Sequence, residues 1–466
     1  MSPEIIDREE ELDALEKEFQ RESSFVVVYG RRRIGKTRLI QEFLKGKGGV
    51  YFLATEEGEA QNRDSLRREI ACFTGNPLLA GAPVEDWSLV FEAFLSFEPE
   101  KKKVIAIDEF QYLCYANQAF PSLMQKIWDT QLSGKKIMLI LCGSFISMME
   151  SQVLAYSSPL YGRRTAQIRL RQIPFRYYGG FFPGKKPAEL VPFYAVTGGV
   201  PKYIEALRAH KNVYEAIAKD VLSRMSFLYE EPHFLLSREV VQVGSYFSII
   251  KTIAAGKRKL VDIASTLGVK QTGLTRYLAT LTSMDIIERE VPVTEEHPEK
   301  SRRGLYRITD NFMLFWFKFI YPNIGVIEAG GERIVLQKIR QNLTDALISF
   351  VYEDICREEL RRAELGKKPY SWNFRIDRAG RWWDRYTEID IVAFDSEGFD
   401  IIFCECKYTK KPLEPEVLFS LEEKSLRVEW KRAQRRTHYV LFSRSGFSPQ
   451  LEALTKKRKD IALVTL

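Results

Sequence analysis

The stretch that decides the fold of this sequence is Phe25-Val-Val-Val-Tyr-Gly-Arg-Arg-Arg-Ile-Gly-Lys-Thr37. Its last eight residues fit the pattern Gly-x-x-x-x-Gly-Lys-Thr, after an apolar strand candidate and before a helical segment, Arg38–Leu44. In that setting glycines let the backbone wrap around phosphate, while successive N–H groups and the helix N-terminus supply positive potential. The pattern therefore predicts a loop that binds the phosphates of ATP.

The residues of this loop have predicted parts in nucleotide binding. Lys36 is expected to reach the β- and γ-phosphates, and Thr37 to bind Mg²⁺ through its hydroxyl. ATP with Mg²⁺ is thus the expected cofactor. The predicted nucleotide contacts are the loop and the first helical residue: Gly30, Arg31, Arg32, Arg33, Ile34, Gly35, Lys36, Thr37 and Arg38.

A second segment supplies two carboxylates at a strand end. Lys103-Val-Ile-Ala-Ile-Asp-Glu109 is an apolar strand candidate that ends in acids. Asp108 suits a Mg²⁺ ligand that acts through the water shell of the ion, and Glu109 suits the general base for the attacking water. We expect both at the edge of the sheet where the phosphate loop begins.

Two more polar positions follow further along the chain. Ser144 comes after the strand candidate Ile137–Cys142 and is either a sensor of the γ-phosphate or a simple turn residue. Arg163 and Arg164 precede the fifth strand candidate. They either stabilise charge on the transferring phosphoryl group, in cis or from a neighbouring subunit, or form a solvated basic turn.

The first 170 residues alternate apolar runs with helix-like stretches, which is typical of a parallel sheet wrapped by helices. The strand candidates are Phe25–Tyr29, Val50–Ala54, Val104–Ile107, Ile137–Cys142 and Gln167–Leu170. Four strings, Tyr-Gly-Arg-Arg-Arg-Ile-Gly-Lys-Thr, Ile-Asp-Glu-Phe-Gln, Cys-Gly-Ser and Leu-Tyr-Gly-Arg-Arg-Thr, resemble the archaeal-type ATPase family of AAA/STAND-related P-loop proteins. The resemblance covers residues 1 to about 235, including Thr197-Gly-Gly-Val-Pro201, and implies ATP hydrolysis and the strand order 5-1-4-3-2.

The domains expected from these patterns are an ATPase core (1–175), a helical lid (176–238), a winged helix-turn-helix (239–325) and a C-terminal α/β domain (334–466). In the third, two short helices are followed by a hairpin with a charged tip. Its predicted recognition helix offers Lys270, Gln271, Thr272, Thr275 and Arg276, and its wing offers Lys300, Arg302 and Arg303. Such a module either contacts DNA or serves as a protein-interaction or structural module.

The C-terminal α/β domain has strand candidates at Ser371–Ile376, Glu388–Phe394, Ile401–Tyr408 and His438–Phe442, and it carries a second group of acids. Asp390 lies in the alternating strand candidate Glu388–Phe394, in which Glu388 and Asp390 share one face. Glu405 and Lys407 share a face of the next strand, and Glu353 lies on the preceding helix, Ile334–Leu360. Asp390, Glu405 and Glu353 are candidate ligands of Mg²⁺ or Mn²⁺, and Lys407 would position the attacking water or stabilise negative charge.

Asp390, Glu405-Cys-Lys407 and the string Gly-Arg-Trp-Trp-Asp384 resemble the PD-(D/E)xK nuclease superfamily, and more closely the C-terminal domain often fused to archaeal-type ATPases. The resemblance implies a restriction-endonuclease-like fold, with either retained catalysis or binding alone. Trp382 and Trp383 either stack on bases or fill the core, and the basic cluster Lys431–Arg436 either follows a phosphate backbone or forms a charged helix face.

Composition limits the class of protein. With 466 residues, 45% hydrophobic and 28% charged, the chain is globular and long enough for about three domains. A net charge of +8 permits a nucleic-acid partner without requiring one. Six cysteines without a CxxC pair favour reduced thiols in a cytoplasmic protein. The most apolar stretch, Phe312–Tyr321, falls short of the roughly 20 residues of a membrane span, so no membrane partner is expected.

Two functions follow from these patterns and stay open. The first is a Mg²⁺-dependent ATPase whose nucleotide state controls a DNA-binding winged helix and a metal-dependent nuclease-like domain. The alternative is an ATP-dependent signalling or regulatory switch that forms homo-oligomers with ATP. In that alternative the C-terminal domain is a catalytically inactive binding module.

Overall fold

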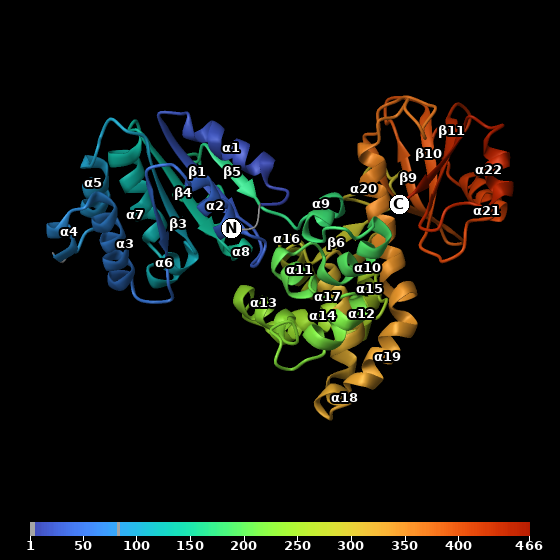
Figure 1. The fold of residues 1–466 in the computed structure, drawn as a ribbon, viewed down its shortest axis with the longest axis horizontal. Helices are drawn as coiled ribbons and strands as arrows, with labels where there is room; N and C mark the ends of the chain where they lie inside the picture. Colours follow the sequence, from blue (N-terminus) through green and yellow to red (C-terminus); the bar gives the residue numbers. More distant parts are fainter. Residues whose placement is uncertain (1–4, 82–83) are drawn as a thin grey trace. The chain divides into compact units, whose positions relative to one another are not determined.

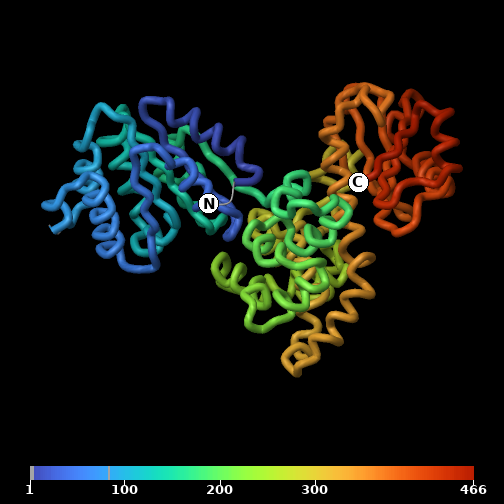
Figure 2. Tube along the Cα trace, viewed as in Figure 1, coloured from blue at the N-terminus to red at the C-terminus, as the bar shows by residue number. Residues whose placement is uncertain are grey.

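The structure, a computed structural model, describes residues 5–81 and 84–466 and divides into two compact units. The first unit comprises the described residues up to Tyr177 together with 200–202 and 234–241. The second comprises 178–199, 203–233 and 242–466. Figures 1 and 2 trace the chain from blue at the N-terminus to red at the C-terminus.

A five-stranded parallel sheet with the order β2-β3-β4-β1-β5 forms the centre of the first unit (Figure 1). Its strands are β1 (Ser23–Tyr29), β2 (Gly49–Leu53), β3 (Lys103–Asp108), β4 (Ile137–Gly143) and β5 (Ala166–Arg169). All of β3 and β4 and nearly all of β1 is buried, which explains their unbroken apolar runs. Read from the other side the order is 5-1-4-3-2, so the order implied by the family resemblance is confirmed.

Helices cover both faces of this sheet. One apolar cluster joins Phe25 and Val27 to helices α3, α5 and α7, and the cluster on the opposite face joins Val26 and Val28 to α1 and α2. The helical elements are α1 (Glu9–Phe19), α2 (Lys36–Leu44), α3 (Glu59–Thr74), α4 (Pro77–Gly81), α5 (Trp87–Ser96), α6 (Gln111–Ala116), α7 (Phe120–Ile127), η1 (Trp128–Leu132), α8 (Ile146–Met149) and η2 (Glu150–Leu154). Three short helices have residues in both units: α9 (Phe175–Tyr178), α11 (Pro201–Leu207) and α13 (Glu231–Glu239).

The second unit is helical up to residue 362 apart from one antiparallel hairpin of β6 (Ile287–Glu290) and β7 (Leu305–Ile308). Most of the segment predicted as a lid, 176–238, belongs to this unit. The helical elements are η3 (Gly179–Phe181), α10 (Pro187–Thr197), α12 (Val213–Ala216), η4 (Ile217–Val221), α14 (Val243–Ala254), α15 (Leu260–Leu267), α16 (Gln271–Ser283), α17 (Asn311–Phe315), η5 (Trp316–Ile320), η6 (Tyr321–Asn323), α18 (Ile324–Glu328), α19 (Glu332–Leu343), η7 (Thr344–Ile348) and α20 (Ser349–Arg362).

The aromatic stretch Phe312–Tyr321 is helical, and most of its side chains are buried inside the second unit. The Trp316 indole donates to the Tyr229 carbonyl at 2.8 Å, so its one polar group is satisfied. The stretch is therefore a short buried helix. In the described part of the chain no helix is both long and apolar enough to cross a membrane.

A second five-stranded sheet, with the order β12-β11-β10-β9-β8, ends the chain. Its strands are β8 (Arg378–Trp383), β9 (Glu388–Phe394), β10 (Asp400–Lys407), β11 (Arg436–Ser443) and β12 (Ile461–Thr465), with α21 (Pro415–Ser425) and α22 (Pro449–Thr455) between the later strands. Strands β10, β11 and β12 are parallel, while β8 and β9 are antiparallel to their neighbours.

Two sequence-based expectations for this sheet are wrong. Residues 371–376, expected as a strand, form no regular element, because Trp372 instead stacks on the ring of His438 with centroids 4.5 Å apart. Strict alternation along β9 also fails. Gly380 pairs with Val392 and Trp382 with Ile389, so β9 carries one extra residue, a bulge. It places Ile389 in the same apolar cluster as Val392 and Phe394 while Ile391 lies outside that cluster, and Glu388 and Asp390 both stay beside Arg381.

Candidate functional site

The loop between β1 and α2 lies at the carboxyl edge of the first sheet and depends on two glycines. Gly30 has φ +148°, and a Cβ there would lie 2.4 Å from the Leu170 carbonyl oxygen. Gly35 has φ +94° and immediately precedes α2. Both positions exclude ordinary side chains, so the backbone can fold closely around a phosphate in front of the helix N-terminus.

Lys36 opens α2 and is directed back over the loop. Its Nζ donates to the carbonyl oxygens of Gly30 and Arg31, each at 2.9 Å, and the side chain is buried. Arg31 and Ile34 are also buried, whereas Arg32 and Thr37 are exposed, and Arg33, Gly35 and Arg38 lie between these extremes. The predicted nucleotide residues therefore form one continuous loop with the lysine charge at its centre.

Thr37 meets the first predicted carboxylate. Its Oγ1 donates to Oδ2 of Asp108 at 2.7 Å, and the hydroxyl of Tyr51 donates to the same oxygen at 2.7 Å. Burial and the adjacent Asp108 charge raise the pKa of the Tyr51 phenol far above its usual value, so it remains a donor. A hydroxyl and a carboxylate this close are hard oxygen ligands, and these residues therefore fit Mg²⁺ entering with a nucleotide.

Glu109 lies at the end of β3 with its backbone in the left-handed region, at φ +54°. Ser144, which follows β4, donates its Oγ proton to Glu109 Oε2 at 2.6 Å. Gln111 also donates to this carboxylate oxygen and lies 3.2 Å from Ser144 Oγ. The two predicted residues thus come together, with Gln111 holding both. This arrangement can fix the orientation of a general base.

Arg163 and Arg164 lie elsewhere. They precede β5, next to Thr165, whose N–H donates to the carbonyl of Phe25 near the start of β1. Arg163 is paired with Asp129 at 2.8 Å in front of β4. This is the amino edge of a parallel sheet, opposite the phosphate loop, so the expected role in cis is wrong. A role from a neighbouring subunit stays a prediction.

Three residues near this site were not predicted from the sequence: Tyr51, Gln111 and Arg169. Arg169 pairs with Tyr29 at the carboxyl end of β5, with its guanidinium carbon 5.7 Å from the Tyr29 ring centroid. The available signal was positional, since Tyr51 and Arg169 lie near the carboxyl ends of strands of a parallel sheet and Gln111 lies two residues beyond the second carboxylate.

The second sheet brings Asp390, Glu405 and Lys407 together. Asp390 accepts from the Cys406 N–H at 2.8 Å, and Lys407 Nζ lies 2.6 Å from Glu405 Oε1. Burial and the Glu405 charge raise the pKa of Asp390. Burial lowers the pKa of Lys407, but attraction to Glu405 outweighs this and leaves it raised. The predicted placement of Glu405 and Lys407 on one face is confirmed, and Cys404 and Cys406 are buried.

Glu353 on α20 adjoins this group but does not complete a metal site. Burial and the Asp390 charge raise its pKa, while Arg381 Nε lies 3.8 Å from its carboxylate. Glu405 is also bonded by Lys424, at 3.1 Å. Within residues 5–81 and 84–466, no three His, Cys, Asp or Glu side chains converge to hold a metal ion. The expected three-carboxylate ligand set is therefore not formed: Glu405 is paired with Lys407 and Lys424, and Arg381 lies beside Glu353.

The hairpin region keeps its predicted polar positions at the surface. The five residues predicted to face a groove from α16 are all exposed: Lys270, Gln271, Thr272, Thr275 and Arg276. At the hairpin tip Lys300 and Arg302 are exposed, and Arg303 bonds Glu295 at 3.0 Å.

Trp382 is buried in the apolar core of the second sheet, whereas Trp383 stays partly exposed. Lys431 donates to the carbonyls of Ser396 and Gly398.

Comparison with known proteins identifies two families. Residues 5–207 match the family described as an ATPase domain predominantly from Archaea, and residues 316–426 match DUF234, described as archaeal and bacterial proteins of unknown function. The uncharacterized protein MJECL04 of Methanocaldococcus jannaschii is 36% identical over 406 residues, which is 87% of each chain. A shorter uncharacterized ATP-binding protein of the same organism is 44% identical over 44 residues, 9% of this chain and 75% of its own length.

Among solved structures, the Walker-type ATPase PABY2304 of Pyrococcus abyssi has a similar fold. It superimposes with a TM-score of 0.52 over 67% of this chain and 96% of its own, at 19% sequence identity. At that identity the likeness concerns the fold alone.

The glycine requirement of the loop can be tested by stability. Gly30→Ala should lower the thermal midpoint of the first unit, because its Cβ would overlap the Leu170 carbonyl at 2.4 Å and the Ile34 side chain at 2.8 Å. Gly46→Ala is the matched control, since it also has positive φ, +74°, but nothing within 4 Å. The control should cost only about 1–2 kcal/mol of backbone strain. Equal midpoints in scanning calorimetry would contradict the packing argument.

Proposed function

We propose that this chain, which belongs to the family of predominantly archaeal ATPases, is a Mg²⁺-dependent ATP hydrolase whose nucleotide state controls its contacts with DNA. The observation that carries the proposal is the meeting of Thr37, Asp108, Glu109 and Ser144 beside the phosphate loop. ATP binding by the chain is also supported by the shorter relative, which is described as an ATP-binding protein.

In this proposal the residues act as follows. Lys36 exchanges its bonds to the Gly30 and Arg31 carbonyls for the β- and γ-phosphates. Thr37 and Asp108 hold Mg²⁺, which when bound neutralises charge on the phosphate oxygens. Glu109 orients the attacking water and accepts its proton, while Ser144 and Gln111 keep the carboxylate in place.

Hydrolysis is tested by separating chemistry from binding. Glu109→Gln should retain ATP affinity and lose about 10²- to 10⁴-fold in kcat, since it removes the base and leaves the loop intact. Lys36→Ala should instead weaken ATP binding itself. Phosphate release and equilibrium binding of ATP by calorimetry give the two readings. Lys45→Ala, an exposed cation at the end of the same helix, is the control. Full hydrolysis by Glu109→Gln would overturn the assignment.

The DNA-binding part of the proposal rests on α15, α16 and the β6–β7 hairpin acting as a winged helix-turn-helix. It is supported by the exposure of the polar residues at the start of α16 and by the cations at the hairpin tip. Residues at the N-terminus of a recognition helix are the ones that reach base edges in such modules. Assembly into an ATP-dependent homo-oligomer is part of the same proposal.

A duplex-binding measurement tests this assignment. Lys270→Ala/Arg276→Ala should reduce the slope of log K against log salt by about 0.9 for each phosphate that the protein no longer neutralises. Arg333→Ala/Lys338→Ala removes two cations from α19 and should leave the slope unchanged. Affinity should also differ between ADP and a non-hydrolysable ATP analogue, and this difference should vanish in Lys36→Ala. Identical affinity in all nucleotide states would refute the control of DNA binding by ATP.

For the second sheet we propose a metal-dependent nuclease activity centred on Asp390, Glu405 and Lys407. Two observations support it. Two carboxylates and a lysine lie close together on adjacent strands, and the charge of Asp390 is near enough to Glu353 to raise the pKa of that carboxyl. One observation favours the alternative, a regulatory switch with an inactive binding domain: Glu405 already bonds both Lys407 and Lys424. A divalent ion would have to displace part of this ion pairing.

Cleavage assays distinguish these two functions. If the domain is a nuclease, Mg²⁺- or Mn²⁺-dependent cleavage of DNA should fall at least tenfold in Asp390→Asn, because the amide is a weaker metal ligand. Asp395→Asn, in the loop after the same strand, is the matched control. Loss of cleavage with chelator should accompany the effect. Wild-type protein that cleaves no nucleic acid under these conditions would leave the switch as the function, without touching the ATPase result.

A further inference from the structure

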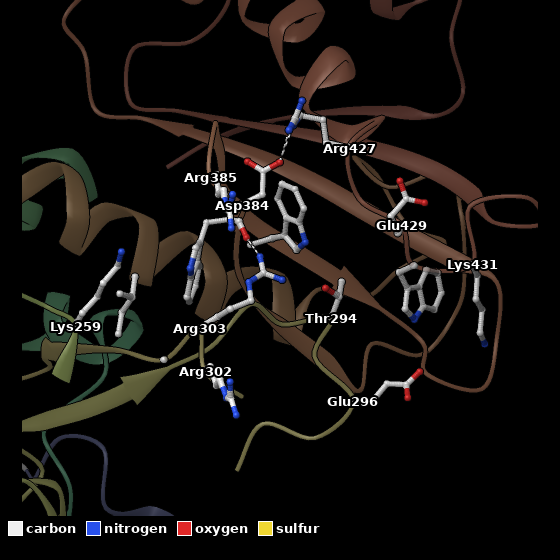
Figure 3. A pocket seen from close by; sticks show the side chains of 15 residues that line it. Lys259, Thr294, Glu296, Arg302, Arg303, Asp384, Arg385, Arg427, Glu429 and Lys431 are labelled. Atoms are coloured by element: carbon white, nitrogen blue, oxygen red, sulfur yellow. Dashed lines mark hydrogen bonds and ion pairs between the residues drawn. The ribbon is translucent and has the colours of Figure 1, made fainter. Parts of the chain in front are cut away.

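A large cleft lies within the second unit, between the β6–β7 loop and the end of the second sheet (Figure 3). Its volume is about 1080 Å³, at the upper limit of the roughly 300–1,000 Å³ of small-ligand pockets. One wall consists of residues 294–296 and 302–305, and the other of 382–385 and 427–431. Lys259 also lines the cleft, which is therefore built from four separate segments of the sequence.

The two walls are fixed to each other by direct bonds. The Val293 N–H donates to the Arg381 carbonyl at 2.9 Å, and Arg378 donates to the Glu295 carbonyl at 3.1 Å. Arg303 bonds both Glu295 and the carbonyl of Trp383, so it crosses from one wall to the other (Figure 3). A cleft braced in this way is a preformed cavity, which reduces the entropic cost of binding a ligand.

Three tryptophans, Trp382, Trp383 and Trp430, line the cleft. Trp382 is buried in the apolar core of the second sheet. Trp383, next along β8, is directed to the other face and is partly exposed; within residues 84–466 it stacks on no other aromatic ring. Trp430 packs against Phe394, with Lys431 Nζ 5.1 Å from its ring centroid. Tyr386 stands beside this wall with 80% of its surface exposed.

The cleft is strongly basic. Six cations line it against the three acids Glu296, Asp384 and Glu429, an excess of three positive charges. Three of the cations hold the walls: Arg303, Arg427 through Asp384 at 2.7 Å, and Lys431 through two carbonyls. The remaining three, Lys259, Arg302 and Arg385, are exposed and form no ion pair within the described residues. They are free to meet an anionic ligand.

This combination of charge and aromatic surface selects among anionic partners. A duplex hides the faces of its bases, so it could use the cations but not the indole face of Trp383. An acidic peptide would likewise leave the aromatic surface unused. Unpaired nucleotides use both, because each base stacks on an aromatic ring while its phosphate meets a cation.

We propose that this cleft binds unpaired nucleotides of a single-stranded nucleic acid, with a base stacked on Trp383 and phosphates held by Lys259, Arg302 and Arg385. The inference deepens the nucleic-acid part of the proposed function and rests on it. It concerns a site separate from the exposed start of α16 and needs no metal or catalytic step.

The test measures binding of fluorescent 12-nucleotide oligothymidine and oligouridine, and of a hairpin duplex, to the full-length chain by anisotropy. Trp383→Ala should weaken binding of the single strands about tenfold, because the stacking of a base on the indole is abolished. Lys259→Ala/Arg385→Ala should lower the salt slope for single strands by about 0.7 for each phosphate that is no longer neutralised. Arg375→Ala/Lys456→Ala removes two exposed cations outside the cleft and is the matched control.

The outcomes separate this site from the others. Preferential loss of oligothymidine or oligouridine binding in the cleft variants supports the proposal, and the ratio of the two ligands tells DNA from RNA. Binding of the duplex alone, or single-strand binding equal in cleft variants and control, overturns it. Lys259 and Arg385 are both exposed, so the variant that replaces them should fold even if Trp383→Ala does not. ATP hydrolysis and duplex binding, measured on the same preparations, should be unchanged, so their failure would be recognised separately.

Discussion

The parallel pairing of β1, β3 and β4 is the constraint on which the nucleotide site depends. These strands are buried on both faces, so polar side chains are tolerated only at their ends. Register pairs Tyr29 with Gly143 and Leu53 with Asp108, which places the loop, the two carboxylates and Ser144 at one edge. A slip of β3 would draw Asp108 into the apolar interior. The burial that stabilises the sheet therefore also confines the polar side chains to one edge, where they lie close together.

Much of this site could be predicted from the sequence because its signals are local. The phosphate loop and the strand-end acids Asp108 and Glu109 follow from short motifs and apolar runs, whereas the strand order was implied by the family resemblance. The roles of Tyr51 and Gln111 could not be read in this way, since each depends on which side chain a neighbouring element presents to Asp108 or Glu109. The role of Arg163 in cis could not be judged from the sequence. A position just before a strand does not show which residue, here Asp129, will pair with the side chain.

The second unit was harder to predict for a related reason. The bulge in β9 breaks the period of two, so that Ile389 joins the core cluster with Val392 while Ile391 does not, and no residue in Glu388–Phe394 indicates the bulge. Trp372 is not part of a strand and instead stacks on His438, which lies 66 residues further along the chain. The basic cleft has no motif either, as it is built from four separate segments. Charge balance adds to this difficulty: the sequence shows acids in a metal-like spacing, whereas the fold supplies Lys407, Lys424 and Arg381 as their counterions.

The backbone of Glu109 carries a wider consequence. A residue with a side chain at φ +54° stores about 1–3 kcal/mol of conformational strain, which the surrounding structure must offset. Glycine would relieve that strain but would remove the carboxylate bonded by Ser144 and Gln111. Stability of the fold and the proposed role of Glu109 in hydrolysis thus place opposite demands on residue 109. At this position the chain accepts a lower stability of the fold in order to keep the carboxylate.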